Sequence, residues 1–378
     1  MKKINLLFVG SFSADNFSSN QKSEIDSKIS GTVLSLSNTY KYFINYFSKR
    51  NSYKLNKFDT SVFRIKKYDK NHFSKLNYLI RFVHNYLNLI LSIFFSNRIL
   101  INSSPHGLAY LSPLIFLSRV LCKRSVLRIF GGREPLNVNF YLKPFVFVSL
   151  ICSSNVGIQS KNITRKYNEF FSSKKFFWLP TARPMPDYSY LKKRHNLSHK
   201  FKGNFFYLGH IRKDKGIDFL IEAFNDERLS DFKLNLYGPL WGQMGEKEIY
   251  KLNIKGKKNI FYHGSIEPES VYKIISEQDA LIFPSISPAE GYPGAVIEAL
   301  LVGTPVIASN WLHLKEFLND SNSILFEPYN SNLIVTSVLE FANNKERRIS
   351  LHRGALKSSK TMFSLQKQSQ SLIDFLKI

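Results

Sequence analysis

Short β-rich runs alternate with segments of helical spacing along the second half of the chain, from about residue 200 onward. Most runs are apolar and end in glycine or another small residue. They are NFFYLG (204–209), LNLYG (234–238), NIFYHG (259–264), ALIFPS (280–285), PVIAS (305–309) and SILFEP (323–328). Helix-spaced segments lie between them at 217–229, 268–278 and 293–302. This alternation predicts a parallel, doubly wound sheet covered by helices on both faces. In such sheets, ligands bind beyond the carboxyl ends of the strands.

The first half repeats the pattern less regularly. Strands are expected at 4–10, 98–104, 125–132 and 155–160, and helices at 31–47 and 76–95. The opening MKKINLLFVGSFSA resembles a short signal peptide, but its apolar run is at the lower limit for one and fits a buried first strand better. Arg81, His84, Asn85 and Asn88 argue against a membrane-spanning helix at 76–95. We expect a mostly buried helix there, one that contacts a bilayer surface.

A length of 378 residues agrees with two domains. The proline-containing, charged segment 176–203 is the best candidate for a linker. We therefore expect two α/β domains, with the C-terminal segment crossing back to the first of them. The expected bounds are 1–185, 186–355 and, for the C-terminal helix, 356–378.

Positive charge is concentrated in the first half of the chain. The net charge is +25. Residues 1–185 hold 28 Lys and Arg against 7 Asp and Glu, whereas residues 186–378 hold 25 against 21. The asymmetry favours a phosphate-bearing partner, either nucleic acid or an anionic membrane surface, although genome base bias also produces Lys-rich chains. Two cysteines, Cys122 and Cys152, are too few for a disulfide framework and fit a reducing cytosol.

The stretch EGYPGAVIEALLVGTPVIAS, residues 290–309, has the features of a phosphate-binding helix end. Pro293 suits the first turn of a helix, and Gly303 suits the position just past its end. Gly291 and the residues after it then offer unpaired N–H groups at the positive end of the helix dipole. Glu298 falls more than one turn into the helix, where its carboxylate could accept hydrogen bonds from a ribose. An ordinary helix with two surface glutamates is the alternative interpretation.

The pattern E-G-Y-P-(x)4-E-A-(x)3-G-T-P-V-I-A resembles the E-x7-E signature of family 4 glycosyltransferases, which are retaining enzymes of the GT-B fold. YLGHIRKDKGIDFLIEAF (207–224) is similar to the opening of that family's donor domain, and HGSI…VYKIISEQDALIFPS to the segment before the signature. The resemblance covers about residues 200–330. It implies two Rossmann-like domains facing a central cleft, the first binding acceptor and the second binding a nucleotide-sugar donor.

The resemblance also implies roles for individual residues in the second half. Glu298 would hold the ribose, and Glu290 would face the donor sugar. Lys215 and Arg212 would neutralise the donor diphosphate, with His210 contributing a charge if protonated, because the family usually has Arg where this chain has His210. The remaining donor-side positions are Gly209, Gly291, Tyr292 and Pro293. No DxD-like pair is placed to hold a metal ion and no dedicated nucleophile stands out, so we expect metal-independent chemistry without a cofactor.

The first half matches the family less closely. Gly31 lies at the family's glycine-led first helix, near the donor phosphates. Many members carry His where this chain has Phe130, which is followed by Gly131, Gly132 and Arg133, as in a subset of bacterial capsule and lipopolysaccharide transferases. His106, in SSPHG, lies at another expected strand end, on the possible acceptor side, and an ordinary loop histidine is an equally good interpretation.

Taken together, these features predict a retaining glycosyltransferase of cell-surface polysaccharide biosynthesis. It would transfer a sugar from a nucleotide donor, with UDP- or GDP-sugar expected, to a glycan or lipid-diphosphate-linked acceptor. It would lie in the cytoplasm against the inner face of the membrane, held by the basic first domain. The alternatives are a basic nucleic-acid-binding protein, a GT-B sugar epimerase or phosphorylase, and an inactive scaffold. No recognition helix, zinc finger or RNP-like motif supports the first of these.

Overall fold

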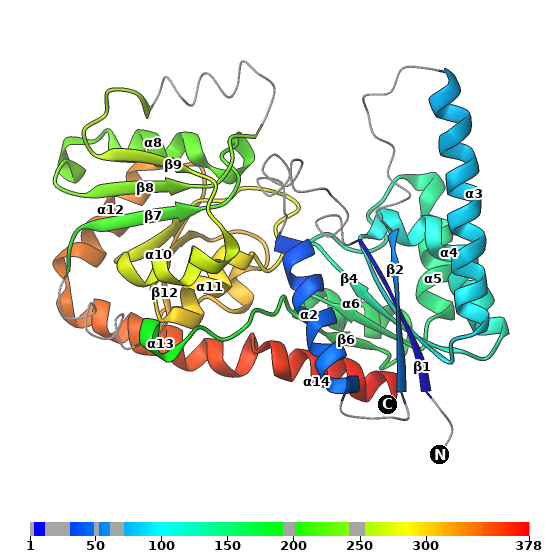
Figure 1. Cartoon of the computed structure of the whole chain (residues 1–378). Helices are drawn as coiled ribbons and strands as arrows, with labels where there is room; N and C mark the ends of the chain where they lie inside the picture. Colours follow the sequence, from blue (N-terminus) through cyan, green and yellow to red (C-terminus); the bar gives the residue numbers. More distant parts are fainter. Residues whose placement is uncertain are drawn as a thin grey trace. The chain divides into compact units, whose positions relative to one another are not determined.

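The structure, a computed structural model, describes residues 4–11, 31–48, 53–60, 72–191, 201–241 and 254–377. These residues form two compact units (Figure 1). The first unit contains the described residues up to Pro180 together with the C-terminal segment from Gln366, and the second contains those from Thr181 to Leu365. Among the described residues, the chain therefore passes from the first unit to the second after Pro180 and returns to the first at Gln366.

The first unit is built on a parallel sheet of six strands in the order β2-β1-β3-β4-β5-β6. The strands are β1 (Ile4–Gly10), β2 (Tyr53–Asp59), β3 (Arg98–Ser103), β4 (Arg124–Ile129), β5 (Asn155–Ile158) and β6 (Phe176–Trp178). The four central strands are those that the sequence predicts. The sequence does not predict the edge strands β2 and β6. In β2, lysines and an asparagine interrupt the apolar residues, and β6 has only three residues, which lie within the expected linker.

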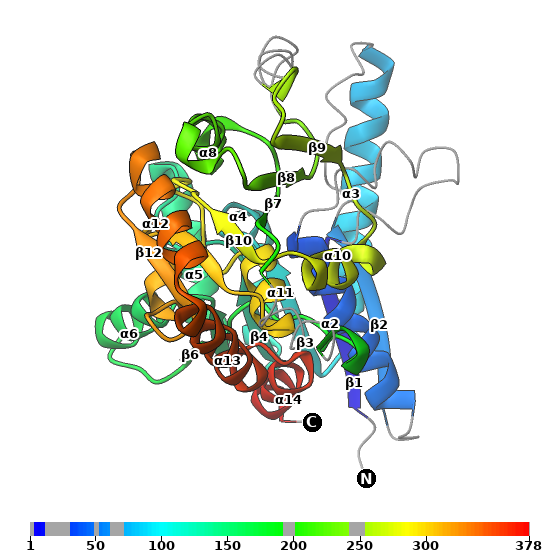
Figure 2. The same cartoon turned by 90° about the vertical axis from the view of Figure 1, so that its left-hand side faces the viewer.

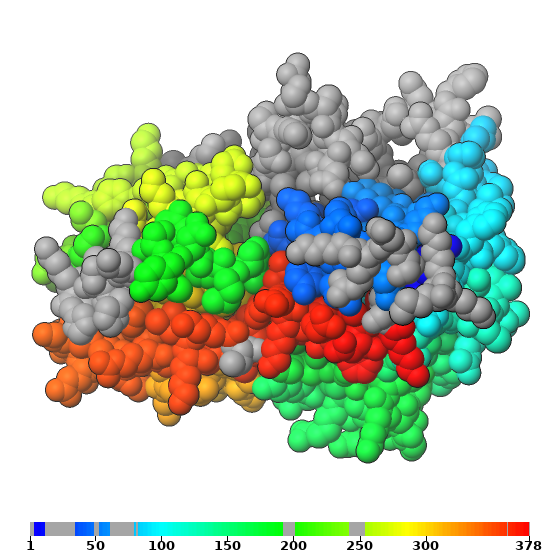
Figure 3. All heavy atoms as spheres, turned by 60° about the horizontal axis from the view of Figure 1, so that its bottom comes forward, coloured from blue at the N-terminus to red at the C-terminus, as the bar shows by residue number. Residues whose placement is uncertain are grey.

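Helices cover both faces of this sheet. On one face α3 (His72–Phe94), α4 (Pro105–Val120), α5 (Lys143–Cys152) and α6 (Lys161–Phe170) contribute to one hydrophobic core. On the other face α2 (Gly31–Ser48) and the C-terminal α14 (Leu365–Leu376) share a second core. Figure 3 shows α14, in red, lying along α2, in blue. The buried Arg128 on β4 ties α2 to the sheet through Thr39 Oγ1 (2.9 Å) and Ser35 Oγ (3.0 Å).

The prediction that the helix at 76–95 is mostly buried is wrong. Among those of its apolar side chains that the structure describes, only Leu89 and Ile93 belong to the buried core. The opposite side of the helix carries exposed leucine, isoleucine, valine and phenylalanine side chains, because only the side with Leu89 and Ile93 packs on the core. Within the described residues, no helix is long and apolar enough to cross a membrane.

The second unit has its own six-stranded parallel sheet, in the order β12-β11-β10-β7-β8-β9. Its strands are β7 (Asn204–Leu208), β8 (Lys233–Tyr237), β9 (Ile260–Gly264), β10 (Ala280–Phe283), β11 (Val306–Ser309) and β12 (Ser323–Phe326). All six are predicted, because each is a short run rich in apolar residues. β10 and β11 are buried along their whole length, whereas the edge strand β9 leaves Phe261 and His263 exposed. The sheet and its helices confirm the predicted α/β class.

Within the described part of the second unit, the helices around the sheet are α8 (Ile217–Phe224), α10 (Val271–Glu277), α11 (Gly294–Val302), α12 (Ser331–Asn343) and α13 (Lys345–Met362). α8 packs against α12, whereas α11 packs against α10 and α13 (Figure 2). Two predicted helices are shorter than expected. The segment 217–229 breaks after Phe224 and ends in a 3-10 turn, which Asp226 caps at the amide of Arg228. The segment 268–278 begins as a 3-10 turn at Pro268.

Candidate functional site

The predicted donor-site residues of the second unit lie at the carboxyl ends of β7 and β10. After β10 the chain forms a loop that runs to α11, whose first residue is Gly294. Pro293 is the N-cap and not the first helical residue, which corrects the predicted position by one. Glu290, Gly291 and Tyr292 are buried in this loop, and Glu298 lies on the second turn of the helix. Gly303 ends the helix with φ of 84°, as the sequence predicts.

Lys215 and Glu290 form an ion pair across 75 residues of sequence. Lys215 Nζ lies 2.5 Å from Glu290 Oε2, and the side chains are 16% and 9% exposed. The hydroxyl of the buried Ser285 donates to the same carboxylate oxygen at 2.6 Å. The structure therefore brings together two residues that the sequence assigns to the sugar and diphosphate ends of one ligand. The ammonium group and the hydroxyl both contact the same oxygen, Oε2, of Glu290.

The turn that carries Lys215 is fastened to the end of β10. Lys213–Lys215 form a 3-10 turn ending at Gly216, whose φ is 70°. A Cβ atom on Gly216 would lie 2.0 Å from the carbonyl oxygen of Pro284, so only glycine permits this approach. The amide of Ile286 also donates to the carbonyl of Asp214 at 3.0 Å. These backbone contacts fix the position of the lysine before any ligand binds.

Arg212 lies on the same turn and pairs with Asp214. Its Nη2 donates to Asp214 Oδ2 at 2.6 Å, and its Nε contacts the same carboxylate. Burial acts to raise the pKa of Asp214, but hydrogen bonds from Arg212 and Ser287 and the charges of Arg212 and Lys215 together lower it below its ordinary value. The carboxylate therefore stays charged at neutral pH. It holds the guanidinium beside Lys215 and partly offsets the positive charge there.

His210 follows Gly209 at the end of β7 and stacks on Trp241, with ring centroids 4.9 Å apart. Its carbonyl accepts a hydrogen bond from the Tyr207 hydroxyl at 2.9 Å. Burial lowers the pKa of His210, and the charges of Arg212 and Lys215 lower it further, against the opposing effect of Asp214. The imidazole is consequently neutral at pH 7. The positive charge beside Lys215 therefore comes from Arg212 and not from His210.

This assignment predicts the titration of His210. We expect its pKa, measured by NMR from the ring proton shifts, to lie below the ordinary value of 6.5. Arg212→Ala should move it upward, because one nearby positive charge is lost. As the pH falls below 6.5, the unfolded chain takes up this proton before the folded protein does. The His210 contribution to stability is therefore present at neutral pH and is lost in acid. A titration at or above 6.5 would contradict this description.

Glu298 has a partner that the sequence did not reveal. Arg183 Nε donates to Glu298 Oε1 at 2.6 Å, and the two side chains are only 3% and 9% exposed. Gly294, at the start of α11, makes room for this arginine, because a Cβ atom there would lie 2.0 Å from Arg183 Nη2. Arg183 stands among the prolines of the expected linker, TARPMP, and no spacing rule connects it to a helix more than a hundred residues later.

The Arg183–Glu298 pair is enclosed by further polar contacts. Arg183 Nη1 donates to the carbonyl of Ala182 at 3.2 Å, and the Tyr272 hydroxyl donates to the carbonyl of Pro184 at 2.5 Å. Burial raises the pKa of Tyr272; the negative charge of Glu298 raises it further, and Arg183 opposes the shift. The tyrosine therefore remains a neutral hydrogen-bond donor over the physiological range. Its hydroxyl holds the segment that carries the arginine.

The predicted residues of the first unit lie at the carboxyl ends of its own strands. His106 is the second residue of α4, directly after β3, and is exposed. Phe130 is buried after β4. Gly131 follows with φ of 106°, and its amide donates to Gln159 Oε1 at 3.0 Å. Gly132 is buried and Arg133 exposed. Gly31 is the first residue of α2.

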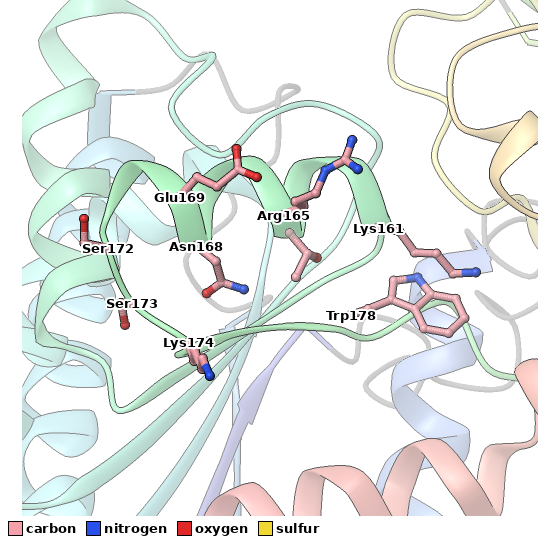
Figure 4. Close-up of a pocket in the computed structure, with 9 residues that line it drawn as sticks. Lys161, Arg165, Asn168, Glu169, Ser172, Ser173, Lys174 and Trp178 are labelled. Carbon is pink, nitrogen blue, oxygen red and sulfur yellow. The ribbon is translucent and has the colours of Figure 1, made fainter.

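A surface hollow that the sequence did not predict lies beside α6 in the first unit. It is lined by Lys161, Thr164, Arg165, Asn168, Glu169, Ser172, Ser173, Lys174 and Trp178 (Figure 4). Lys161 Nζ lies 4.4 Å from the centre of the Trp178 ring. None of the predicted site residues lines this hollow. Within the described ranges, no three His, Cys, Asp or Glu side chains are grouped as metal ligands would be.

Two parallel six-stranded sheets, each flanked by helices, define the GT-B class of folds. Solved structures agree over the whole chain. Anabaena HepE in complex with UDP-glucose superposes with a TM-score of 0.69 over 99% of each chain at 14% identity. Sucrose-phosphate synthase from Thermosynechococcus elongatus gives 0.66 over 99% and 98% at 13% identity. At these identities the likeness establishes the fold.

Residues 191–358, within the second unit, match the family described as glycosyl transferases group 1. The lipopolysaccharide 1,2-N-acetylglucosaminetransferase of Salmonella typhimurium is 30% identical over 168 residues, 42% of this chain and 43% of that protein. An uncharacterized 41.2 kDa protein in the cps region of Klebsiella pneumoniae is 30% identical over 129 residues, 34% of each. The chain thus matches between a third and a half of the length of these relatives. It resembles the family 4 glycosyltransferases of capsule and lipopolysaccharide loci.

Proposed function

We propose that this protein is a retaining glycosyltransferase that moves a sugar from a nucleotide-sugar donor to a glycan or lipid-linked acceptor in cell-surface polysaccharide assembly. The observation that carries the proposal is the Lys215–Glu290 ion pair at the N-terminal end of α11, inside a group 1 glycosyltransferase domain. The relatives named above come from capsule and lipopolysaccharide systems, which supports the acceptor class.

The donor diphosphate would bind between the start of α11 and the Lys215 turn. The amides around Gly291 and Tyr292 lie at the positive end of the helix dipole and would contact phosphate oxygens. Lys215 and Arg212 would add charge on the other side. When the anomeric C–O bond breaks, the leaving nucleoside diphosphate gains negative charge, and these groups stabilise it without needing to reorganise. In this proposal the reaction needs no metal ion and no cofactor.

Glu290 and Glu298 would bind the two hydroxyl-rich parts of the donor. Glu290, fixed by Lys215 and Ser285, would accept hydrogen bonds from the transferred sugar. Glu298 would accept them from the ribose through Oε2, because Arg183 already donates to Oε1. Gly209, His210 and Pro293 would complete the donor side. The acceptor would attack the face of the sugar that the diphosphate leaves, through an oxocarbenium-like state, so that configuration is retained without a protein nucleophile.

We assign acceptor binding to the first unit and keep Gly31, the first residue of α2, as a candidate donor-binding residue. His106, Gly131, Gly132 and Arg133 at its strand ends are the candidate acceptor-facing residues. Phe130 has no group that can activate an acceptor hydroxyl, so in this proposal a different group does so. The enzyme would work in the cytoplasm as a peripheral protein on the inner membrane face. UDP- or GDP-sugar is the expected donor, and solved structures of Anabaena HepE contain UDP and UDP-glucose.

A thermal-shift screen with UDP-, GDP-, ADP- and dTDP-sugars tests the donor site. A ligand at about one hundred times its Kd stabilises the folded state by about 2.7 kcal/mol. We therefore expect one nucleotide class to raise the Tm by roughly 5–10 °C. Glu298→Ala should abolish this response, because the ribose loses its acceptor, whereas Glu222→Ala, an exposed glutamate on α8, should leave it intact. No response in the wild type, or an equal one in the Glu298 variant, would refute the assignment.

A further inference from the structure

Exposed apolar side chains gather on one part of the first unit. Of the 23 large hydrophobic residues exposed in the described chain, 15 lie on α3, α4, α5 or on the adjoining segments at residue 95 and residues 140–142. They are Leu79, Ile80, Val83, Leu87, Leu91, Phe94, Phe95, Tyr110, Phe116, Val120, Phe140, Tyr141, Phe145, Phe147 and Ile151. Monomeric soluble proteins rarely leave so large a contiguous set uncovered, and such patches mark protein or membrane contacts.

These residues belong to neighbouring helices. α3 contacts α4, and α4 contacts α5, and all three contribute to the same core on one face of the first sheet (Figure 1). On α3 the exposed positions 80, 83, 87, 91 and 94 recur at helical spacing, opposite the buried Leu89 and Ile93. On α4 Tyr110, Phe116 and Val120 are exposed, whereas Leu111, Leu114 and Ile115 are buried. The helices are therefore apolar on both their inner and outer sides.

The same helices lack negative charge. α3, α4, α5 and residues 140–142 contain no Asp or Glu. Residues 72–152 as a whole hold nine Lys and Arg against one acid, Glu134. Exposed cations stand among the apolar side chains: Arg119 near the end of α4 and Lys143 at the start of α5. The Nζ of Lys123 donates to the carbonyl of Phe94 at 3.0 Å, which places another cation at the end of α3.

We propose that the outer face of α3, α4 and α5, called here the apolar face, docks the protein on an anionic lipid bilayer. Its leucine, isoleucine and phenylalanine side chains enter the boundary between headgroups and acyl chains, while Arg119, Lys123 and Lys143 meet lipid phosphates. Charge decides between a bilayer and a second copy. Two such faces in contact would oppose cations to cations, with no carboxylate on either side to pair with them.

Membrane docking by the apolar face rests on the proposed function in one respect: its purpose would be to bring the first unit to lipid-linked acceptors. Lipid binding itself needs no donor and no catalysis. The two ideas can therefore fail separately. Absence of vesicle binding with an intact response to nucleotide sugar removes the apolar face alone, and absence of that response with intact vesicle binding removes the donor site alone.

The test is co-flotation of the full chain with vesicles of 30% phosphatidylglycerol in phosphatidylcholine, compared with phosphatidylcholine alone. We expect the wild type to bind the anionic vesicles more tightly than the neutral ones. Leu87→Glu with Leu91→Glu, both 53% exposed on α3, should weaken binding to the anionic vesicles by at least about tenfold. The Tm and the nucleotide-sugar response should not change, because neither leucine is buried.

The matched control is Tyr188→Glu with Phe261→Glu, two exposed apolar residues of the second unit. It makes the same change in net charge and should alter vesicle binding by no more than about twofold, because its residues lie outside the apolar face. Three outcomes would overturn the proposal. The wild type could fail to bind anionic vesicles, both double variants could lose vesicle binding equally, or the Leu87→Glu, Leu91→Glu variant could bind vesicles as tightly as the wild type. A change in oligomeric state measured by light scattering, with vesicle binding unchanged, would identify the face as a contact between copies.

Discussion

Replacing Lys215 by alanine is expected to slow sugar transfer by about two to three orders of magnitude, the range found when one preorganised charge-stabilising group is removed from an active site. The loss should fall on kcat more than on KM, because the lysine meets charge that develops on the leaving diphosphate. Release of nucleoside diphosphate from the donor identified by thermal shift is the measurement. Donor binding should weaken much less, since the α11 amides and Glu298 remain.

Lys213 provides the control for this experiment, because it lies on the same 3-10 turn but is exposed. Lys213→Ala should change kcat by no more than about twofold, as expected for a solvated charge screened by salt. Lys215→Arg keeps the charge but not the compact ammonium group that fits between Glu290 and the ligand, so its activity should be intermediate. If Lys215→Ala retained more than a tenth of the wild-type kcat, the lysine would not stabilise the leaving group.

Arg183→Ala is expected to cost the second unit about 3–5 kcal/mol of stability, the usual result of removing one partner from a buried ion pair. Glu298 would remain 9% exposed with its charge unpaired, and space would open beside Gly294. Urea unfolding of the second unit, together with amide exchange of α11, measures the effect. We expect earlier unfolding, faster exchange in α11 and loss of the response to nucleotide sugar.

Arg183→Ala has two effects: it leaves Glu298 without its ion-pair partner, and it removes the volume of the arginine side chain. A second substitution separates them. In an Arg183→Ala background, Glu298→Gln removes the stranded charge and should recover part of the lost stability. Arg353→Ala, an exposed arginine of α13, should cost less than about 0.5 kcal/mol. The Arg183–Glu298 assignment would be wrong if Arg183→Ala cost no more than Arg353→Ala, or if the two substitutions at the pair were additive.

The central strands of both sheets could be predicted because burial on both faces leaves a continuous apolar run, as in Ile4–Gly10 and Ala280–Phe283. The edge strands of the first sheet could not. β2 is half solvated and carries Lys54 and Lys57, and β6 is too short to form a pattern. The position of the helix at 76–95 could be predicted, but its exposure could not. Hydrophobicity shows that a side chain is apolar and does not show whether a neighbouring element covers it.

The sequence by itself determined the α/β class and the position of α11, whose start is the proposed phosphate site, and it supplied the candidate residues Lys215, Glu290 and Glu298. Strand periodicity, glycine at a helix end and a motif are all local features. Only the tertiary structure decided that Lys215 lies 2.5 Å from Glu290, that Arg183 holds Glu298, and that His210 is neutral beside Trp241. It also decided that three helices leave their outer sides uncovered. Each of these depends on which distant segments meet, and burial at those contacts sets the strength of an ion pair and the pKa of a side chain.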